Sequence, residues 1–342
     1  MPFTALTSLE DQISQIKSIV EINEEVRNSI SNDSHPVSTP IDELYWRRYD
    51  YCSAILRLYS SFERFIIDSL QKWLDWIVKN KLPILSQSDK AISRYRYGVG
   101  EILKRSTESR FSKINITALV NSLTALHNNQ DTHLGIDPIF ATSPNLRFND
   151  VISALESLEL IGASEWLNAF PPLKEGCETS DTTPEKFLKE LVDRRNEAAH
   201  GNKMPDEFWS VTLIKDAASL VLSLATAIAE FIVYNMICIV ERNPIINGNK
   251  LELPNIGKIG EVFKKHNAFV ICANKTGLWK GMKILVVTNM RCYIDILVSI
   301  QLNGNSACAW MATKNEEIGL CTEILPHKSA RLYSLDEMVC FQ

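Results

Sequence analysis

The segment Arg195-Asn196-Glu197-Ala198-Ala199-His200 places an arginine five residues before a histidine. A histidine, with an unperturbed pKa of about 6.5, can accept or donate a proton near neutral pH. An arginine carries a permanent charge and a planar fork of donors that can stabilise a pentacoordinate phosphorane. RNA can be cleaved with these groups alone, because its own 2′-hydroxyl attacks the adjacent phosphate. Arg195 and His200 are therefore the candidate catalytic residues.

The spacing of the pair adds a geometric constraint. Residues five apart on an α-helix of 3.6 residues per turn diverge by about 140°, so Arg195 and His200 do not share a face. Asn196 lies four residues before His200, on its face, and could orient the imidazole or contact the phosphate. Arg195 and His200 converge on one phosphate only if the helix unwinds near Gly201 or if two protomers supply one residue each. We favour the second arrangement, in a homodimer or a higher even oligomer.

The helix that carries the pair has clear boundary signals. Thr183 is a preferred N-cap residue and Pro184 suits the first helical position, so a helix is predicted from there to about Ala199. Gly201 can end it. A longer helix is predicted from Leu44 to Asn80, where apolar residues follow one stripe. An amphipathic stripe of the same kind near the N-terminus consists of Leu6, Leu9, Ile13, Ile16, Val20 and Asn23.

Further helices complete a bundle over the first 240 residues. Short helices are predicted at Asp150 to Ile161 and Glu165 to Phe170, with loops at Asp131 to Asn149 and Pro171 to Thr183. A long apolar helix is predicted from Pro205 to Val240. Its length would suit a membrane span, but Glu230 and Asn235 interrupt it, so we expect a buried bundle helix and no membrane partner.

The composition changes after Asn243-Pro244 and Asn247-Gly248. β-Branched runs separated by Gly-containing turns replace the helical stripes, as in a small barrel. These runs are Ala268 to Cys272, Met282 to Val287 and Ile294 to Ile300. Periodicity alone leaves open that Met290 to Leu302 forms a helix. The predicted fold class is α+β multidomain, with a mainly α-helical bundle over residues 1–242 and a small β-barrel over residues 250–342.

Composition and charge narrow the class of protein. Of the 342 residues, 45% are hydrophobic and 23% are charged, values typical of soluble globular proteins. The net charge of -5 provides no general attraction for nucleic acid. Lys90 to Lys113 is the exception, because seven cations and two carboxylates give it a local charge of +5. As an alternative to a solvated helix face, this stretch could bind single-stranded RNA. Its candidate RNA-binding residues are Arg94, Tyr95, Arg96, Tyr97, Lys104, Arg105 and Arg110.

Cysteine usage and the N-terminus point to a cytoplasmic protein. The eight cysteines form no C-x2-C pair, and we expect them to be reduced. The N-terminus lacks the charged and apolar regions of a secretory signal. His127, Asp131 and His133 lie too far from a fourth ligand to predict a metal site, and no Gly-rich phosphate loop is found. No metal or other cofactor is expected.

Two segments of the bundle carry a family resemblance. Leu191 to Gly201 resembles the R-x4-6-H motif of HEPN domains, and Leu58 to Phe65 resembles the corresponding helix of the MAE_28990/MAE_18760-like, RiboL-PSP-related HEPN group. The resemblance covers roughly residues 1 to 242. It implies a homodimeric, metal-independent endoribonuclease with a composite site at the dimer cleft, producing a 2′,3′-cyclic phosphate and a 5′-hydroxyl. Such proteins are often toxins or antiphage effectors that attack tRNA, mRNA or rRNA.

The resemblance also assigns roles and partners. Arg195 and His200 would carry the chemistry and Asn196 would support it. The supporting residues would be Glu63, Arg194 and Glu197, with Glu63 pairing with Arg194 or Arg195. Expected partners are RNA, such as tRNA, and an antitoxin or a phage-derived trigger. The alternative is a non-catalytic HEPN dimer that binds RNA or a protein.

The C-terminal part is similar to the second domain of elongation factor Tu-type GTPases. The resemblance implies recognition of a substrate or partner, and a barrel that only packs is the alternative. Its segments are Lys258 to Phe263, Lys280 to Val287, Ser299 to Leu302 and Glu317 to Leu320.

Overall fold

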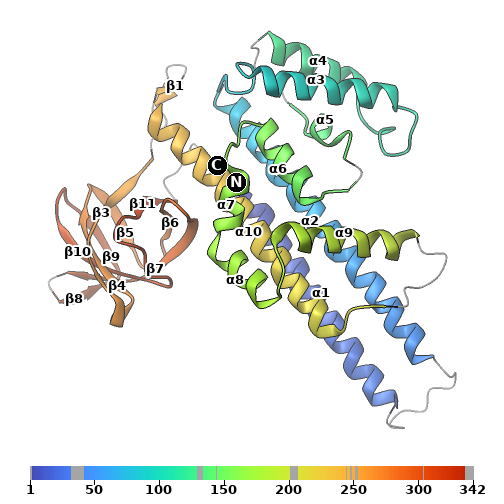
Figure 1. Ribbon diagram of the computed structural model, residues 1–342. Helices are drawn as coiled ribbons and strands as arrows, with labels where there is room; N and C mark the ends of the chain where they lie inside the picture. The colour runs from blue at the N-terminus through green and yellow to red at the C-terminus, as the bar shows by residue number, and fades with distance from the viewer. Residues whose placement is uncertain are drawn as a thin grey trace. The chain divides into compact units, whose positions relative to one another are not determined.

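The computed structural model divides the chain into two compact units, Met1–Ala229 and Glu230–Gln342. It describes residues 2–31, 42–128, 134–143, 145–200, 207–243, 245–246, 249–250, 253–302 and 304–335, without the side chains of residues 31, 200, 245, 246, 249 and 250. Within these ranges, ten helices precede a set of β-strands (Figure 1).

The two longest helices of the first unit, α1 (Pro2–Ser31) and α2 (Glu43–Lys79), lie side by side (Figure 1). The predicted stripe of α1 is confirmed from Leu6 to Val20, because its apolar members are buried. Asp42 caps α2 by accepting from the backbone N–H groups of Leu44 and Tyr45, at 2.9 and 3.2 Å. The other helices are α3 (Asp89–Lys104), α4 (Ile116–His127), α5 (Asp137–Phe140), α6 (Phe148–Ser157), α7 (Ala163–Ala169), α8 (Pro171–Thr179), α9 (Pro184–His200) and α10 (Val211–Arg242).

Both predicted loops prove to contain helix. Residues 171–183 were expected to be irregular, but Pro171–Thr179 forms α8, since proline is well suited to the first turn of a helix. The segment from Asp131 to Asn149 contains α5 and the start of α6, while residues 131–133 and 144 lie outside the described part. The prediction for α9 is confirmed at its start, where the backbone N–H of Lys186 donates to Thr183 Oγ1 at 3.2 Å.

The long apolar helix α10 begins at Val211, with residues 207–210 non-helical before it. Among the described residues it alone is long and apolar enough to cross a membrane, but 72% of its most apolar window is buried inside the protein. Core helices of water-soluble proteins pass the same test. One such helix is weak grounds for a membrane span, and its burial accords with the predicted bundle helix.

The second unit contains the predicted barrel, which is confirmed. Six antiparallel strands follow the order β10-β4-β3-β11-β6-β7, and pairing of β7 with β10 closes the ring. The helix proposed as an alternative for Met290 to Leu302 is wrong, because this segment contains the whole of β7. The barrel strands are β3 (Asn255–Phe263), β4 (Ala268–Ala273), β6 (Lys283–Val287), β7 (Cys292–Leu302), β10 (Glu317–Thr322) and β11 (Arg331–Ser334).

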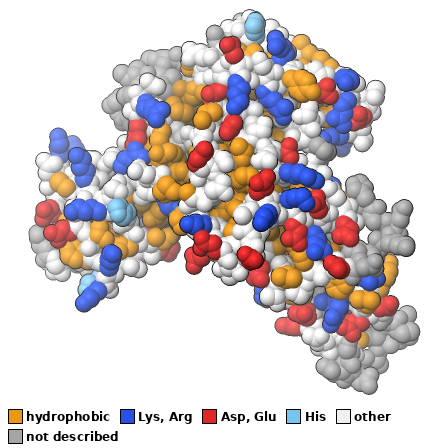
Figure 2. Space-filling model, viewed as in Figure 1, with side chains coloured by type: hydrophobic (Ala, Val, Ile, Leu, Met, Phe, Trp, Pro, Cys, Tyr) orange, Lys and Arg blue, Asp and Glu red, His pale blue; other side chains and the backbone are white. Residues whose placement is uncertain are grey.

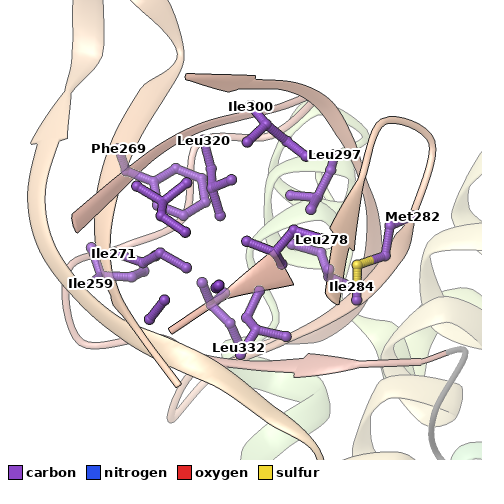
Figure 3. Close-up of a cluster of buried hydrophobic side chains, with 14 of the residues drawn as sticks. Ile259, Phe269, Ile271, Leu278, Met282, Ile284, Leu297, Ile300, Leu320 and Leu332 are labelled. Atoms are coloured by element: carbon purple, nitrogen blue, oxygen red, sulfur yellow. The ribbon is translucent and has the colours of Figure 1, made fainter. Parts of the chain in front are cut away.

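Apolar side chains fill the barrel (Figure 3). Phe269, Ile271, Leu297 and Leu332 are each 0% exposed, as alternation of inward and outward residues along barrel strands requires. The second unit also has shorter elements. β1 (Ile245–Ile246) pairs with β2 (Asn249–Lys250), β5 (Thr276–Trp279) pairs with β9 (Ala309–Ala312), and β8 (Asn305–Ala307) pairs with β7, all antiparallel. The 3₁₀ turn η1 (Lys264–His266) joins β3 to β4.

Candidate functional site

Arg195 lies on the side of α9 that faces the bundle, one turn after the buried Leu191 and Val192. Its guanidinium is 5.1 Å from the ring centre of Tyr59 on α2. Nη1 donates to Asn145 Oδ1 at 3.3 Å and to Asn196 Oδ1 at 3.0 Å. Three neutral groups from α2, α9 and the segment before α6 therefore hold this cation in a partly buried position.

The charge of Arg195 is uncompensated at close range. Among the described residues, no carboxylate lies within ion-pair distance of it, whereas the neighbouring Arg147 and Arg194 pair with Asp193 and Glu190. Keeping a cation partly out of water without a counter-ion costs free energy, which an anionic ligand would recover. Arg195 is thus arranged as an anion-binding group.

The carboxyl of Glu63 interacts electrostatically with Arg195. It lies one turn after Tyr59 on α2 and is partly buried. Burial raises the pKa of its carboxyl, and the charges of Arg195 and Arg110 offset only part of that rise. The sequence left open whether Glu63 pairs with Arg194 or with Arg195. It is the charge of Arg195 that affects the pKa of Glu63. A carboxyl that keeps its proton to higher pH is suited to proton transfer.

Tyr59 also fixes the segment that carries Asn145. Its hydroxyl accepts from the backbone N–H of Leu146 at 2.7 Å, and burial raises the pKa of Tyr59 to about 12. Arg147 Nη2 donates to Asp193 Oδ1 on α9 at 3.2 Å. Residues 145–147 are therefore tied to both α2 and α9. The sequence analysis gave no role to Tyr59 or Asn145. Tyr59 could have been identified as a site residue from its position one helical turn before Glu63.

Arg194 points away from this site. Its guanidinium is 5.4 Å from the Trp209 ring centre, and it donates to the Glu207 carbonyl at 3.3 Å and to Glu190 Oε1 at 3.5 Å. Glu197 is exposed on α9. The contacts of Arg194 hold residues 207–209 against α9, so the structure separates the two adjacent arginines into different environments.

His200 is the last residue of α9, and its side chain lies outside the described residues, as does Gly201. The helix stays regular up to His200, so the helix positions of Arg195 and His200 diverge by about 140°. Unwinding before His200 is thereby ruled out for this conformation. Asn196, which shares the helix face of position 200, is partly buried and contacts Arg195.

The predicted RNA-binding stretch is only partly available to a ligand. Tyr95, a predicted RNA-binding residue, is 2% exposed, so its ring cannot stack on a base in this conformation. Three of the predicted arginines instead donate to backbone carbonyls of residues 139–143 and hold α5, in contacts across 30 to 45 residues. These are Arg94, Arg105 and Arg110. The exposed members are Arg96, Tyr97, Lys104 and Arg110, the last of which still donates to backbone carbonyls. The face in Figure 2 shows cations interspersed with carboxylates.

The described residues contain no group of three or more His, Cys, Asp or Glu side chains that could hold a metal ion. His127 is exposed at the end of α4, and Asp131 and His133 lie outside the described part.

No curated protein and no solved structure matches the chain. The family model of MAE_28990-like HEPN domains, by contrast, matches residues 3–238, which is more than half of the 342 residues. The match includes Tyr59, Glu63, Arg195 and His200. The chain belongs to the MAE_28990-like HEPN family, whose wider group is commonly associated with RNA and ribonuclease activity.

Proposed function

We propose that the protein is a metal-independent endoribonuclease. The 2′-oxygen of RNA attacks the adjacent phosphorus, the bond from phosphorus to the 5′-oxygen breaks, and a 2′,3′-cyclic phosphate and a 5′-hydroxyl result. His200 takes the 2′-hydroxyl proton or protonates the leaving oxygen. Arg195 stabilises the phosphorane, with Asn196 beside it.

The observation that carries this proposal is the uncompensated charge of Arg195. Its partners are the amide oxygens of Asn145 and Asn196 and the ring of Tyr59, so its full positive charge remains for a phosphate. Membership of the HEPN family gives independent support. The raised pKa of Glu63 makes it a candidate for the second proton transfer, since the reaction needs both a base and an acid.

A shared site in a homodimer fits the geometry of α9. Since the helix stays regular to His200, one protomer presents positions 195 and 200 in different directions. Two α9 helices related by a two-fold axis would allow Arg195 of one chain to meet His200 of the other. We therefore propose a composite site, in a cytoplasmic toxin or antiphage effector acting on RNA such as tRNA and controlled by an antitoxin or a phage-derived trigger.

Purified protein incubated with total RNA in EDTA tests the proposal. Wild type should yield fragments with 2′,3′-cyclic phosphate ends, while Arg195→Ala and His200→Ala should each lose about 100-fold or more in rate. Arg64→Ala is a matched control, because Arg64 is a highly exposed arginine on α2 that pairs with Asp68 at 2.8 Å. Cleavage that is the same in all four proteins would sink the assignment.

The rival function is a non-catalytic HEPN dimer that binds RNA or protein. One observation favours it: two donors of Arg195 are already satisfied by Asn145 and Asn196. A protein that binds RNA but yields no cleaved product, even with a cell extract supplying a trigger, would decide for this alternative.

A further inference from the structure

The outer face of the barrel contains a hollow of about 410 Å³ that the proposed cleavage site does not use. Its floor consists of small residues on neighbouring strands. Gly319 of β10 lies between Val270 of β4 and Gln301 of β7, and Cys321 of β10 lies between Ala268 and Ser299. Because Gly319, Cys321, Ala268 and Ser299 have short side chains or none, the sheet surface is locally depressed. We call this hollow the barrel groove.

The rim of the barrel groove combines an aromatic ring with free polar groups. Phe263, at the end of β3, lines it and is 44% exposed. The side chains of Gln301, Ser299 and His266 also line it, and within the described part of the chain none of these three has a recorded hydrogen-bond partner. An apolar floor and wall with uncommitted donors and acceptors suit a flat ligand with polar edges.

Charge at one end of the groove indicates an anionic ligand. His266 belongs to η1, where Lys264 and Lys265 are both exposed, and Asn267 closes the turn at φ 47°. No ion pair of either lysine with a described residue is recorded. Two carboxylates share the outer face near the floor: Glu261 of β3, opposite Val270, and Glu317 of β10, two residues before Gly319.

We propose that the barrel groove binds one unpaired nucleotide of an RNA strand. Phe263 stacks on the base, Gln301 and Ser299 contact its polar edge, and Lys264 and Lys265 hold the flanking phosphates. The choice of RNA among anionic ligands with a planar group rests on the proposed function. The groove adds a substrate-holding site on the barrel, distinct from the phosphate site at Arg195.

Binding of a labelled 2′-O-methyl oligoribonucleotide of about ten nucleotides, a typical length for such sites, tests the proposal on the full chain. This probe lacks the attacking hydroxyl and cannot be cleaved. Phe263→Ala should weaken binding roughly tenfold, since one stacked base contributes about 1–3 kcal/mol. Lys264→Ala with Lys265→Ala should lower the slope of log K against log salt by about 1.4, and Glu261→Gln should strengthen binding.

Matched controls come from residues of the barrel unit that do not line the groove. Trp279, 36% exposed on β5, is an aromatic residue away from the groove, and Lys275 and Lys280 are exposed lysines beside it. Trp279→Ala and the double change Lys275→Ala, Lys280→Ala should leave affinity and slope near wild type. Circular dichroism confirms folding of every variant, and Gln301→Ala, at an exposed residue without a recorded partner, provides a second groove variant if Phe263→Ala unfolds.

The inference is overturned if the groove variants match the controls in both affinity and salt slope. That result is expected if the groove binds a protein and not RNA. This result differs from failure of the proposed function. A protein that binds the probe through Phe263 but cleaves no RNA keeps the groove and loses the nuclease. A protein that cleaves RNA but binds the probe equally without Phe263 keeps the nuclease and loses the groove.

Discussion

Arg195 in the helical unit and Arg291 in the barrel unit have similar aromatic neighbours but different counter-charges. The guanidinium of Arg195 is 5.1 Å from the ring centre of Tyr59, and that of Arg291 is 5.0 Å from the ring centre of Tyr293. Arg291 also donates through Nε and Nη2, at 2.9 Å each, to the carboxylate of Glu230, which is 1% exposed.

In this comparison, Arg291 is a structural arginine, whereas Arg195 is available to a ligand. Glu230 also accepts from the backbone N–H of Cys292 at 2.8 Å, so the pair joins the second half of α10 to the start of β7 within the second unit. Arg195 contacts only neutral oxygens and a ring among the described residues. The neutralised arginine should matter for stability, and the uncompensated one for binding and chemistry.

The largest expected effect is on catalysis by Arg195→Ala. Loss of the phosphorane-stabilising group should lower the cleavage rate about 100- to 1,000-fold. The free energy of unfolding should fall by less than in Arg291→Ala, because the lost hydrogen bonds run from the Arg195 cation to neutral oxygens and no carboxylate is left buried without a counter-ion. Rates on a short RNA and urea denaturation of the same samples measure both quantities. If Arg195→Ala instead loses so much stability that unfolding explains the lost activity, Arg195 has a structural role like that of Arg291.

Arg291→Ala should have the reverse profile. Removing one partner leaves Glu230 buried without its counter-ion, at a cost of about 3–5 kcal/mol in the free energy of unfolding. Replacing both residues by leucine should recover most of this loss, because apolar side chains remove the buried charge. Urea denaturation monitored by the barrel tryptophans measures it. Arg331→Ala, at a more exposed pair with Glu241, is the control with a smaller loss.

Mixed protomers test whether the charge of Arg195 serves a neighbouring chain. In a random mixture of Arg195→Ala and His200→Ala subunits, half of the dimers contain both variants, and each of these has one intact composite site. Activity should therefore recover to about a quarter of the wild-type rate after subunit exchange. Recovery that never exceeds the sum of the two separate variants would indicate a site built within one chain.

The sequence predicted the elements better than their contacts. The stripe from Leu6 to Val20 and the capping residue Thr183 are local signals, and both were confirmed. Pro171 and Pro172 suggested a loop, although they begin α8, because proline stops a helix and also starts one.

The site itself depends on distant contacts that a single sequence does not contain. Arg195 reaches Asn145 across 50 residues, and Tyr59 reaches Leu146 across 87. The same limit explains the stretch that its sequence indicated to be a basic, aromatic face. Tyr95 is buried, and Arg94 and Arg110 donate to backbone carbonyls of α5. Periodicity indicates that a side is polar, but packing decides whether its charges bind solvent or backbone carbonyls.

A smaller effect is expected from the tyrosines beneath the two arginines. Tyr59→Phe keeps the ring but leaves the backbone N–H of Leu146 without its acceptor, which costs about 1–3 kcal/mol. Tyr293→Phe should cost less, since no hydrogen bond to its hydroxyl is recorded among the described residues. Thermal unfolding compares the two variants. Equal losses would mean that Tyr59 does not anchor residues 145–147.

The smallest effect concerns Glu63, whose carboxyl pKa is influenced by the charge of Arg195. Burial raises the pKa of Glu63 above its ordinary value of 4.5, so the stability that its protonated form contributes is complete at low pH and is lost as pH rises through the folded-state pKa. Relative to Glu63→Gln, which does not titrate, wild type should therefore lose stability from about pH 4 upward. Glu108 provides the opposite sign, because a hydrogen bond from Arg105 lowers its pKa, so wild type should gain stability relative to Glu108→Gln as pH rises. Urea denaturation at several pH values measures both differences. If wild type gained stability with pH relative to both variants, Glu63 would be an ordinary ionised partner of Arg195, and the charge of that arginine would be neutralised like that of Arg291.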